Sequence, residues 1–312
     1  PDSFTFTGEA SGAISDGQQL SVPDLIPGNY SSTETVPAGW DLTSLVCDDG
    51  NSSGDVGTAT ASFVLDPGET VTCVFTNTQR GSIIVEKQTL PDGAPDTFTF
   101  TGAASGTISD NQQIVVNDLI PGNYSSSETV PLDWALTGIV CDDTNSSGNV
   151  GTLTANFVLD PGETVTCVFT NTQGGSITVE KQTDPDGSPQ TFEFTGDVAG
   201  TIGDNGVITV PVEPGTYTST ELLPTGWDLT SIVCDDTDST GDTVTATATF
   251  QVEAGEAVRC VFTNTGRGTI IVEKQTDPDG STQTFDFSGD ATGSISDGQQ
   301  IVVADLPPGV YT

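Results

Sequence analysis

Residues 84–89 read IVEKQT, residues 178–183 read TVEKQT, and residues 271–276 read IVEKQT again. These segments contain Lys87, Lys181 and Lys274, the only lysines in 312 residues. The first two stand 94 residues apart and the last two 93, so the chain repeats with a period near 94 residues. Solubility does not require a residue type that occurs once in each repeat and nowhere else. The pattern therefore indicates a chemical role for the lysine.

The repetition extends far beyond the lysine segments. Residues 81–174 align with residues 175–266 along their whole length, ending in GETVTCVFTNTQ and GEAVRCVFTNTG. Residues 1–80 match a repeat that lacks its first strand, and residues 267–312 match the first half of a repeat. We therefore predict two complete domains between two partial ones, as a window on a longer tandem array. The link between the complete domains is so short that it favours a linear rod.

The spacing of apolar residues within a repeat predicts β-strands. Phe98 and Phe100 alternate with threonines, and Cys167 and Phe169 share one face of a later strand. Turn signals such as PDG, IPGN and DPGE separate these runs, and no segment carries a convincing helical stripe. About seven short strands in one repeat predict an all-β fold of tandem immunoglobulin-like β-sandwich domains.

The composition excludes several classes of function. Six basic residues stand against 44 acidic ones, which gives a formal charge of −38, and there is no histidine. Contacts to phosphates need clustered cations, so we expect no nucleic-acid partner. Hydrolytic and metal-dependent catalysis lack their usual residues, so we expect no enzyme beyond a self-modification that turns over once. No apolar run approaches the roughly 20 residues that span a bilayer, so we expect no membrane insertion in this segment.

The cysteines form one pair per repeat, with the two members 26 positions apart. No CxxC motif or histidine accompanies them, so zinc and redox-motif interpretations are weak. A regular, even set predicts disulfides formed in an oxidising compartment outside the cytosol, although two buried thiols are the alternative. Each such bond stabilises a small domain by roughly 3 to 4 kcal/mol. The predicted pairs are Cys47 with Cys73, Cys141 with Cys167, and Cys234 with Cys260.

Three polar residues of each repeat fall on strand faces that should be buried. Alternation places Lys87 on the apolar face of its strand, Asn171 on the face of Phe169, and Glu128 on the face of Tyr124. A buried charge is costly unless it is paired. We therefore predict that lysine, glutamate and asparagine converge inside each sandwich.

Such a cluster suggests a specific reaction. Burial lowers the pKa of a lysine and raises the pKa of a glutamate, so a neutral amine can face the carboxamide. A protonated glutamate can then polarise the amide and shuttle the proton. Held in contact, the two groups condense with loss of ammonia and form an intramolecular isopeptide bond. The alternative is a buried Lys–Glu salt bridge with the asparagine hydrogen-bonded nearby.

Residues 122–134, GNYSSSETVPLDW, carry a Gly-x-Tyr-x-x-x-Glu pattern followed by proline and an aromatic residue. Together with the opening IVEKQTxPDG and the closing FTNT, this pattern resembles the Cna B-type, prealbumin-like (SpaA-like) domains of bacterial pilins and adhesins. The resemblance covers essentially the whole repeat and implies a prealbumin-like β-sandwich. In that family a first-strand lysine joins an asparagine or aspartate of the last strand, with the middle-strand glutamate as catalyst.

The resemblance implies a role for particular residues of this chain. In the first repeat Glu34 and Asn77 occupy the matching positions without a lysine in this window, and Lys274 lacks its partners. The paired cysteines and the near-absence of other lysines depart from typical pilin domains, and a disulfide could make a second staple redundant. The implied crosslinks are Lys87 with Asn171 under Glu128, and Lys181 with Asn264 under Glu221.

Acidic hairpins at residues 49–54, 143–148 and 236–241 follow the first half of a calcium loop. Threonine stands where such a loop needs its final glutamate, so we interpret them as solvated hairpins. We therefore expect no cofactor and no metal site, with calcium as a weak alternative.

Taken together, these features predict a structural protein at the cell surface or outside the cell. It would self-associate into a filament, pilus-like fibre or adhesin stalk that disulfides and isopeptide bonds stabilise. The alternative is a surface binding module whose acidic and tryptophan loops bind calcium, a glycan or a host protein. The loops repeat nearly as faithfully as the strands, which favours the structural interpretation.

Overall fold

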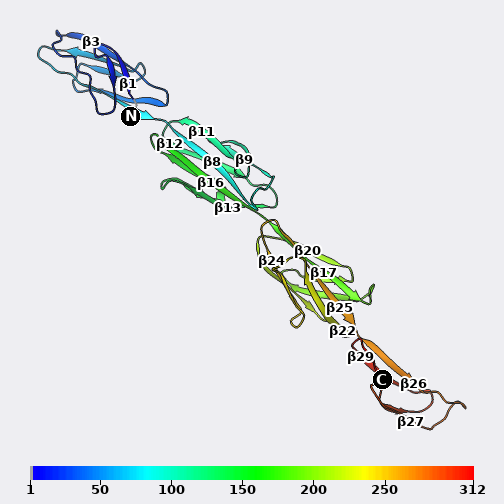
Figure 1. The fold of residues 1–312 in the computed structure, drawn as a ribbon. Coiled ribbons are helices and arrows are strands. Elements are labelled where there is room, and N and C mark those ends of the chain that lie inside the picture. Colours follow the sequence, from blue (N-terminus) through cyan, green and yellow to red (C-terminus); the bar gives the residue numbers. More distant parts are fainter. Residues whose placement is uncertain (1–2) are drawn as a thin grey trace. The chain divides into compact units, whose positions relative to one another are not determined.

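The computed structural model describes residues 3–312, whose regular structure is almost entirely β-strand (Figure 1). The predicted first repeat starts at residue 1, so its first two residues lie outside the described part. Within residues 3–312 the one helical element is the 3-10 turn η1 (Val150–Thr152), and no helix there could cross a membrane. The chain divides into two compact units, residues 1–132 with 136–171, and residues 133–135 with 172–312.

The second repeat is a sandwich of two sheets. The five-stranded sheet has the order β10 (Gly106–Ser109), β9 (Thr97–Gly102), β12 (Gly122–Thr129), β15 (Thr154–Leu159) and β14 (Ser147–Asn149). The four-stranded sheet has the order β11 (Gln113–Leu119), β8 (Gly81–Leu90), β16 (Thr164–Gln173) and β13 (Trp134–Cys141). The all-β prediction is confirmed, but residues 81–174 contain nine strands where about seven were expected. The expected number was too low because short strands such as β10 and β14 stand beside strong turn signals.

The third repeat has the same two sheets. The five-stranded sheet has the order β19 (Gly200–Gly203), β18 (Thr191–Gly196), β21 (Gly215–Leu222), β24 (Thr247–Val252) and β23 (Thr240–Asp242). The four-stranded sheet has the order β20 (Val207–Val212), β17 (Gly175–Asp184), β25 (Ala257–Gly266) and β22 (Trp227–Cys234). The first and last strands of the repeat, β17 and β25, are parallel neighbours, with Thr183 opposite Asn264. This pairing brings the two ends of the repeat together in the middle of one sheet.

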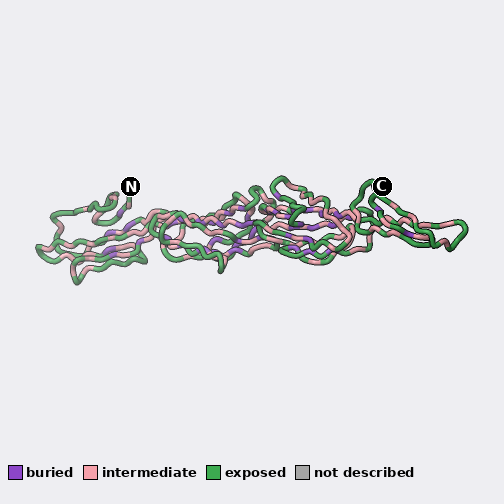
Figure 2. The backbone as a smooth tube through the Cα atoms, turned by 90° about the horizontal axis from the view of Figure 1, so that it is seen from below, coloured by how far each residue is buried: buried purple, intermediate pink, exposed green. Residues whose placement is uncertain are grey.

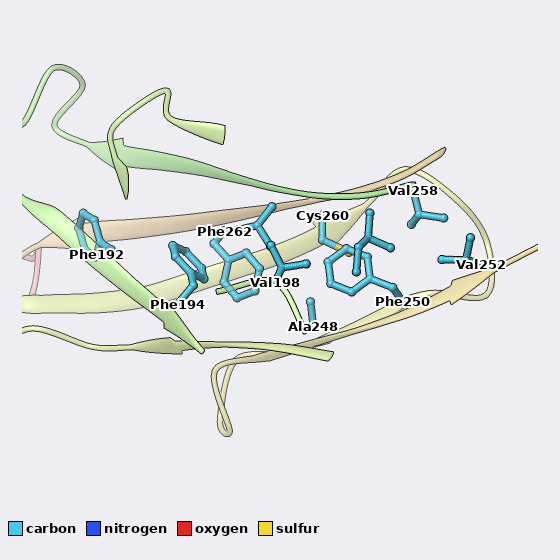
Figure 3. Packing of buried hydrophobic residues seen from close by; sticks show 11 residues of the cluster. Phe192, Phe194, Val198, Ala248, Phe250, Val252, Val258, Cys260 and Phe262 are labelled. Atoms are coloured by element: carbon cyan, nitrogen blue, oxygen red, sulfur yellow. The ribbon is translucent and has the colours of Figure 1, made fainter. Parts of the chain in front are cut away.

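A phenylalanine-rich core fills the space between the two sheets of the third repeat. Figure 3 shows Phe194 of β18 beside Phe262 of β25, with Phe192 of β18 at one end of the layer and Phe250 of β24 further along it. The alternation that the sequence predicts is responsible, because every second residue of each strand faces this layer. Full burial of one such side chain stabilises the fold by roughly 1.5 to 3 kcal/mol.

The two terminal parts are smaller. Within residues 3–80 one sheet has the order β2 (Gly12–Ile14), β1 (Phe4–Gly8), β3 (Gly28–Thr35), β6 (Thr60–Leu65) and β5 (Ser53–Asp55), and β4 (Trp40–Cys47) pairs with β7 (Cys73–Gln79). The last part pairs β26 (Gly268–Glu273) with β29 (Gln300–Leu306), and β27 (Phe285–Phe287) with β28 (Gly293–Ile295). Buried residues follow the strands in Figure 2, whereas the turns are exposed.

Candidate crosslinking site

Each complete repeat brings one lysine, one glutamate and one asparagine together in its core. In the second repeat β8 carries Lys87, β12 carries Glu128 and β16 carries Asn171. Their exposed fractions are 0%, 4% and 0%. The equivalent residues of the third repeat, Lys181, Glu221 and Asn264, are 0%, 2% and 0% exposed. The predicted burial is therefore confirmed, while the chemical roles of these residues remain predictions.

Hydrogen bonds hold the lysine amine firmly. Lys87 Nζ donates to Asn171 Oδ1 at 2.9 Å, to the carbonyl oxygen of Gln88 at 2.6 Å and to that of Phe169 at 3.1 Å. The amine also lies 4.2 Å from the ring centroid of Phe98, a distance at which the ring attracts a cation. Three acceptors match the three hydrogens of an ammonium group. The side chain is therefore fixed with its nitrogen against the asparagine.

The third repeat reproduces this arrangement closely. Lys181 Nζ donates to Asn264 Oδ1 at 2.9 Å, to the carbonyl oxygen of Gln182 at 2.7 Å and to that of Phe262 at 2.9 Å. The ring of Phe192 lies 4.4 Å away. Two independent copies of one geometry indicate that the repeat sequence itself specifies it.

The glutamate lies beside the amine without a direct hydrogen bond to it. Glu128 Oε1 is 3.8 Å from Lys87 Nζ, and Glu221 Oε1 is 3.7 Å from Lys181 Nζ. Among residues 3–312, no group forms a well-directed hydrogen bond with either carboxylate, or with the amide nitrogen of Asn171 or Asn264. The asparagine still acts on the carboxyl group of each repeat, because Asn171 lowers the pKa of Glu128 and Asn264 lowers that of Glu221.

Burial brings the pKa values of the amine and the carboxyl group close together. Desolvation lowers the pKa of Lys87 to about 8, although the charges of Glu128 and Asp110 oppose the shift. It raises the pKa of Glu128 to about 7, against the opposing effects of Lys87 and Asn171. One pKa unit corresponds to about 1.4 kcal/mol, so moving the proton from amine to carboxylate costs little. The site can therefore present a neutral amine beside a protonated acid.

The third repeat shows the same directions of shift. Burial lowers the pKa of Lys181 to about 8 and raises the pKa of Glu221. Both complete repeats therefore place a lysine of lowered pKa beside a glutamate of raised pKa.

The terminal parts each contain one portion of this site. In the first repeat Asn77 Nδ2 donates directly to Glu34 Oε1 at 2.6 Å, and burial raises the pKa of Glu34. In the last part Lys274 Nζ donates to the carbonyl oxygen of Gln275 and lies 4.4 Å from the ring of Phe285. Within the described residues no glutamate or asparagine side chain is paired with Lys274.

Sequence reasoning missed an aspartate that shapes the lysine strand. Asp110 accepts the backbone N–H of Thr89 at 2.7 Å and that of Gly93 at 2.8 Å, which closes the turn after Lys87. Asp204 makes the same two bonds in the third repeat, to Thr183 and Gly187. An aspartate recurs 23 residues after every lysine, and this constant offset was the available signal.

The three predicted disulfides are present in the described residues, each within one repeat. They join Cys47 to Cys73, Cys141 to Cys167, and Cys234 to Cys260. Each links β-strands that are direct neighbours in a sheet, with Cα atoms 3.9 to 4.0 Å apart.

The acidic hairpins are held by internal hydrogen bonds. Asp143 accepts from the hydroxyl of Ser146 at 2.7 Å, and Asp236 accepts from the hydroxyl of Ser239 at 2.6 Å. In the part of the chain that the structure describes, no three acidic or cysteine side chains are grouped so as to hold a metal ion.

Comparison with known protein families identifies the domains. A sequence profile of the prealbumin-like fold domain matches residues 1–79, 83–173 and 177–266. The chain belongs to the family of prealbumin-like fold domains. A search of curated proteins by sequence found no match.

Several solved structures resemble the chain at low sequence identity. The Bacillus anthracis TIE protein is 16% identical over 97% of this chain, which spans 59% of that protein, with a TM-score of 0.32. The streptococcal ancillary pilin is 18% identical over 76% of both chains, with a TM-score of 0.25. The shaft pilin SpaA from Lactobacillus rhamnosus GG is 13% identical over 61% of this chain and 99% of its own, with a TM-score of 0.23. At these identities the likeness concerns the fold alone.

Proposed function

We propose that this chain is a structural segment of a filament at the cell surface or outside the cell, a pilus-like fibre or an adhesin stalk. Its complete repeats would carry Lys87–Asn171 and Lys181–Asn264 isopeptide bonds in addition to their disulfides. Membership of the prealbumin-like family and the pilin folds among similar structures support this class of function. The protein would have no catalytic turnover beyond forming its own crosslinks, and it would self-associate into fibres.

The observation that carries the proposal is the contact between amine and amide in a core closed to solvent. Lys87 Nζ lies 2.9 Å from Asn171 Oδ1, with a carboxyl group 3.8 Å from the same nitrogen. Reacting groups held at such distances gain the effective concentration that amide formation needs. The third repeat offers the same contacts at 2.9 and 3.7 Å.

The reaction follows from the residues in place. The ammonium of Lys87 gives a proton to Glu128, and the neutral amine then attacks Cγ of Asn171. The bond from Nζ to Cγ forms, the bond from Cγ to Nδ2 breaks, and Glu128 passes its proton to the departing nitrogen. Glu128 then takes the second proton from Nζ and passes it to the released ammonia, which leaves as ammonium, so the glutamate ends as the carboxylate it began as.

The product would stabilise the fold considerably. The new bond joins residues 84 positions apart. In the chain-entropy treatment of crosslinks, closing a loop of that length contributes about 4 to 5 kcal/mol. The bond would also join the first strand of the repeat to the last, so that pulling on the chain ends could not separate them.

The test is the intact mass of the full chain after complete reduction and unfolding. We expect a chain lighter than its sequence by two molecules of ammonia, one for each complete repeat. E128A and E221A should each prevent one of these two losses of ammonia. E34A is the matched control, because the same change in the first repeat should leave both losses in place. A wild-type mass equal to that of the plain sequence would show that the cluster is only a buried polar network.

A further inference from the structure

The reactive position of Asn264 depends on the register of β25. This strand lies between β17 and β22, with Thr183 opposite Asn264 on one side and Leu229 opposite it on the other. A shift of one residue moves a side chain by about 3.3 Å along the strand and turns it to the opposite face. Either change would remove Asn264 Oδ1 from Lys181 Nζ.

The pairing of β22 with β25 contains an irregularity beside this asparagine. Leu229 is opposite Asn264 and Ser231 is opposite Thr263, so Thr230 is an extra residue in β22. Its hydroxyl donates to the carbonyl oxygen of Thr263 at 3.0 Å. The first repeat has the same irregularity between Leu42 and Ser44. A bulge disrupts the ladder locally, so the ladder by itself holds the register of this strand pair less firmly beside Asn264.

The disulfide lies on the other side of the bulge and removes that freedom. Cys234 is the direct cross-strand partner of Cys260, with a Cα separation of 4.0 Å. Cys260 and Asn264 stand four residues apart on the same buried face of β25. A covalent bond at this pair forbids any shift between the two strands. Once Lys181 is joined to Asn264, that crosslink itself fixes the strand, so the disulfide can help to position Asn264 only beforehand.

We propose that the intradomain disulfides position the asparagines for crosslinking, so that isopeptide formation follows cysteine oxidation. The inference rests on the isopeptide bond proposed above. The disulfide and the isopeptide bond of a repeat then have different roles and are not redundant. Crosslinking is also confined to an oxidising compartment. Cys141–Cys167 has the same task for Asn171, which follows Cys167 by four residues.

The two steps balance separately. Two thiols lose two protons and two electrons to a small-molecule disulfide such as oxidised glutathione, which is reduced to two thiols. Isopeptide formation then involves no oxidant, since Lys181 and Asn264 condense with loss of one ammonia.

The experiment follows crosslinking in the full chain from its unfolded, reduced state. The chain is synthesised in a cell-free system, held in denaturant, and folded by dilution with oxidised or with reduced glutathione. Samples are quenched in acid, and the crosslinked peptides of the second and third repeats are quantified separately by mass spectrometry. Hydrogen exchange in β25 reports whether the third repeat has folded.

Three variants isolate the role of register. C234A/C260A removes the disulfide of the third repeat and leaves the second repeat as an internal control. C234A/C260A/V233C/V261C restores a disulfide at the neighbouring cross-strand pair Val233 and Val261, of which Val233 is exposed and Val261 partly buried. E221A is the chemical control that should not crosslink the third repeat under any condition.

We expect C234A/C260A to crosslink its third repeat at least tenfold more slowly than wild type, because small misplacements of reacting groups cost that much or more. The second repeat should be unchanged, and the relocated disulfide should restore the rate. Wild type in reduced glutathione should be slow in both repeats.

Equal rates with and without the disulfide, in folded protein, would overturn the inference. So would a relocated disulfide that forms and permits folding but leaves crosslinking slow. If C234A/C260A fails to fold, the crosslinking rate of the variant with the relocated disulfide decides whether the inference holds. A wild-type chain that never loses ammonia in oxidising buffer would instead refute the proposed function, which is a distinguishable result.

Discussion

The equivalent glutamate and asparagine make different hydrogen bonds in the first repeat and in the two complete repeats. In the first repeat the amide nitrogen of Asn77 donates to Glu34 at 2.6 Å. In the second repeat the amide of Asn171 instead presents its oxygen to Lys87 at 2.9 Å, and the described residues offer its nitrogen no well-directed hydrogen bond. Where the lysine is present, it adds a contact to the amide oxygen, and the asparagine has a less direct interaction with the glutamate than Asn77 has with Glu34.

The comparison separates what each group contributes. Glutamate and asparagine form a satisfied pair by themselves, because a carboxylate accepts readily from an amide nitrogen. The amine adds a stronger, charge-assisted donor to the amide oxygen. The amide nitrogen, which is the leaving group of the proposed reaction, then faces the glutamate without the short, direct hydrogen bond of the first repeat.

The largest predicted effect comes from removing the lysine of a complete repeat, which leaves only the glutamate and asparagine that the first repeat has. K87M should abolish the crosslink of the second repeat and lower the free energy of unfolding of that repeat by about 4 to 5 kcal/mol. The chain should then lose one ammonia in place of two. Denaturant-dependent hydrogen exchange, resolved by repeat, measures the stability, and intact mass measures the crosslink. K274M is the control and should retain both losses; two losses in K87M would show that Lys87 is not the nucleophile.

A smaller effect is expected from breaking the hydrogen bond between Asn77 and Glu34 in the first repeat. E34A leaves the amide nitrogen of Asn77 without its acceptor in a partly buried place, which costs about 1 to 3 kcal/mol. E34Q keeps an acceptor oxygen of the same shape and should cost less. Hydrogen exchange in residues 28–35 and 73–79 compares the two variants. Identical stability of both with wild type would show that the pair contributes nothing to the first repeat.

The rate of crosslinking in a complete repeat should depend on pH, because it needs both the lysine and the glutamate. Below about pH 7 both Glu128 and Lys87 hold protons, so the amine has no free electron pair. Above about pH 8 both groups have lost them, so no acid remains to assist the leaving nitrogen. The rate of ammonia loss during folding should therefore be greatest between about pH 7 and 8 and fall roughly tenfold per unit outside it. A rate that rises steadily to pH 10 would assign no role to a protonated glutamate.

The smallest effect concerns an ion pair that the second repeat lacks. Arg267 binds both carboxylate oxygens of Asp228 at 2.7 and 2.9 Å, beyond the bulge on the side opposite the disulfide. The matching positions of the second repeat are Gly174 and Ala135. R267A should hardly change the crosslinking rate of the third repeat while the disulfide is intact, because exposed ion pairs contribute little. A marked loss of rate in the peptide assay would show that the arginine, and not the disulfide, fixes the register.

Much of the site could be predicted from local sequence. Lys87, Glu128 and Asn171 each fall on the buried face of their own strand, and strand alternation alone determines that. The cysteine pairs followed from their regular spacing in the same way. Asp110 was missed because its task is to bind the backbone N–H groups of Thr89 and Gly93 across a turn, and a turn motif by itself does not show which groups it binds.

The sequence by itself determined the period, the all-β class, the burial of one lysine in each complete repeat and the family, because each depends on residue types within one strand or one repeat. Only the tertiary structure decided that β17 and β25 are parallel neighbours and that a bulge lies beside Asn264. It also decided that Lys181 donates hydrogen bonds both to the carbonyl oxygen of Phe262 and to the side chain of Asn264. The contacts of Lys181 join residues 81 and 83 positions apart, and the bulge lies between strands whose paired residues Leu229 and Asn264 are 264 − 229 = 35 positions apart. Their geometry depends on the register between strands, which no single strand encodes.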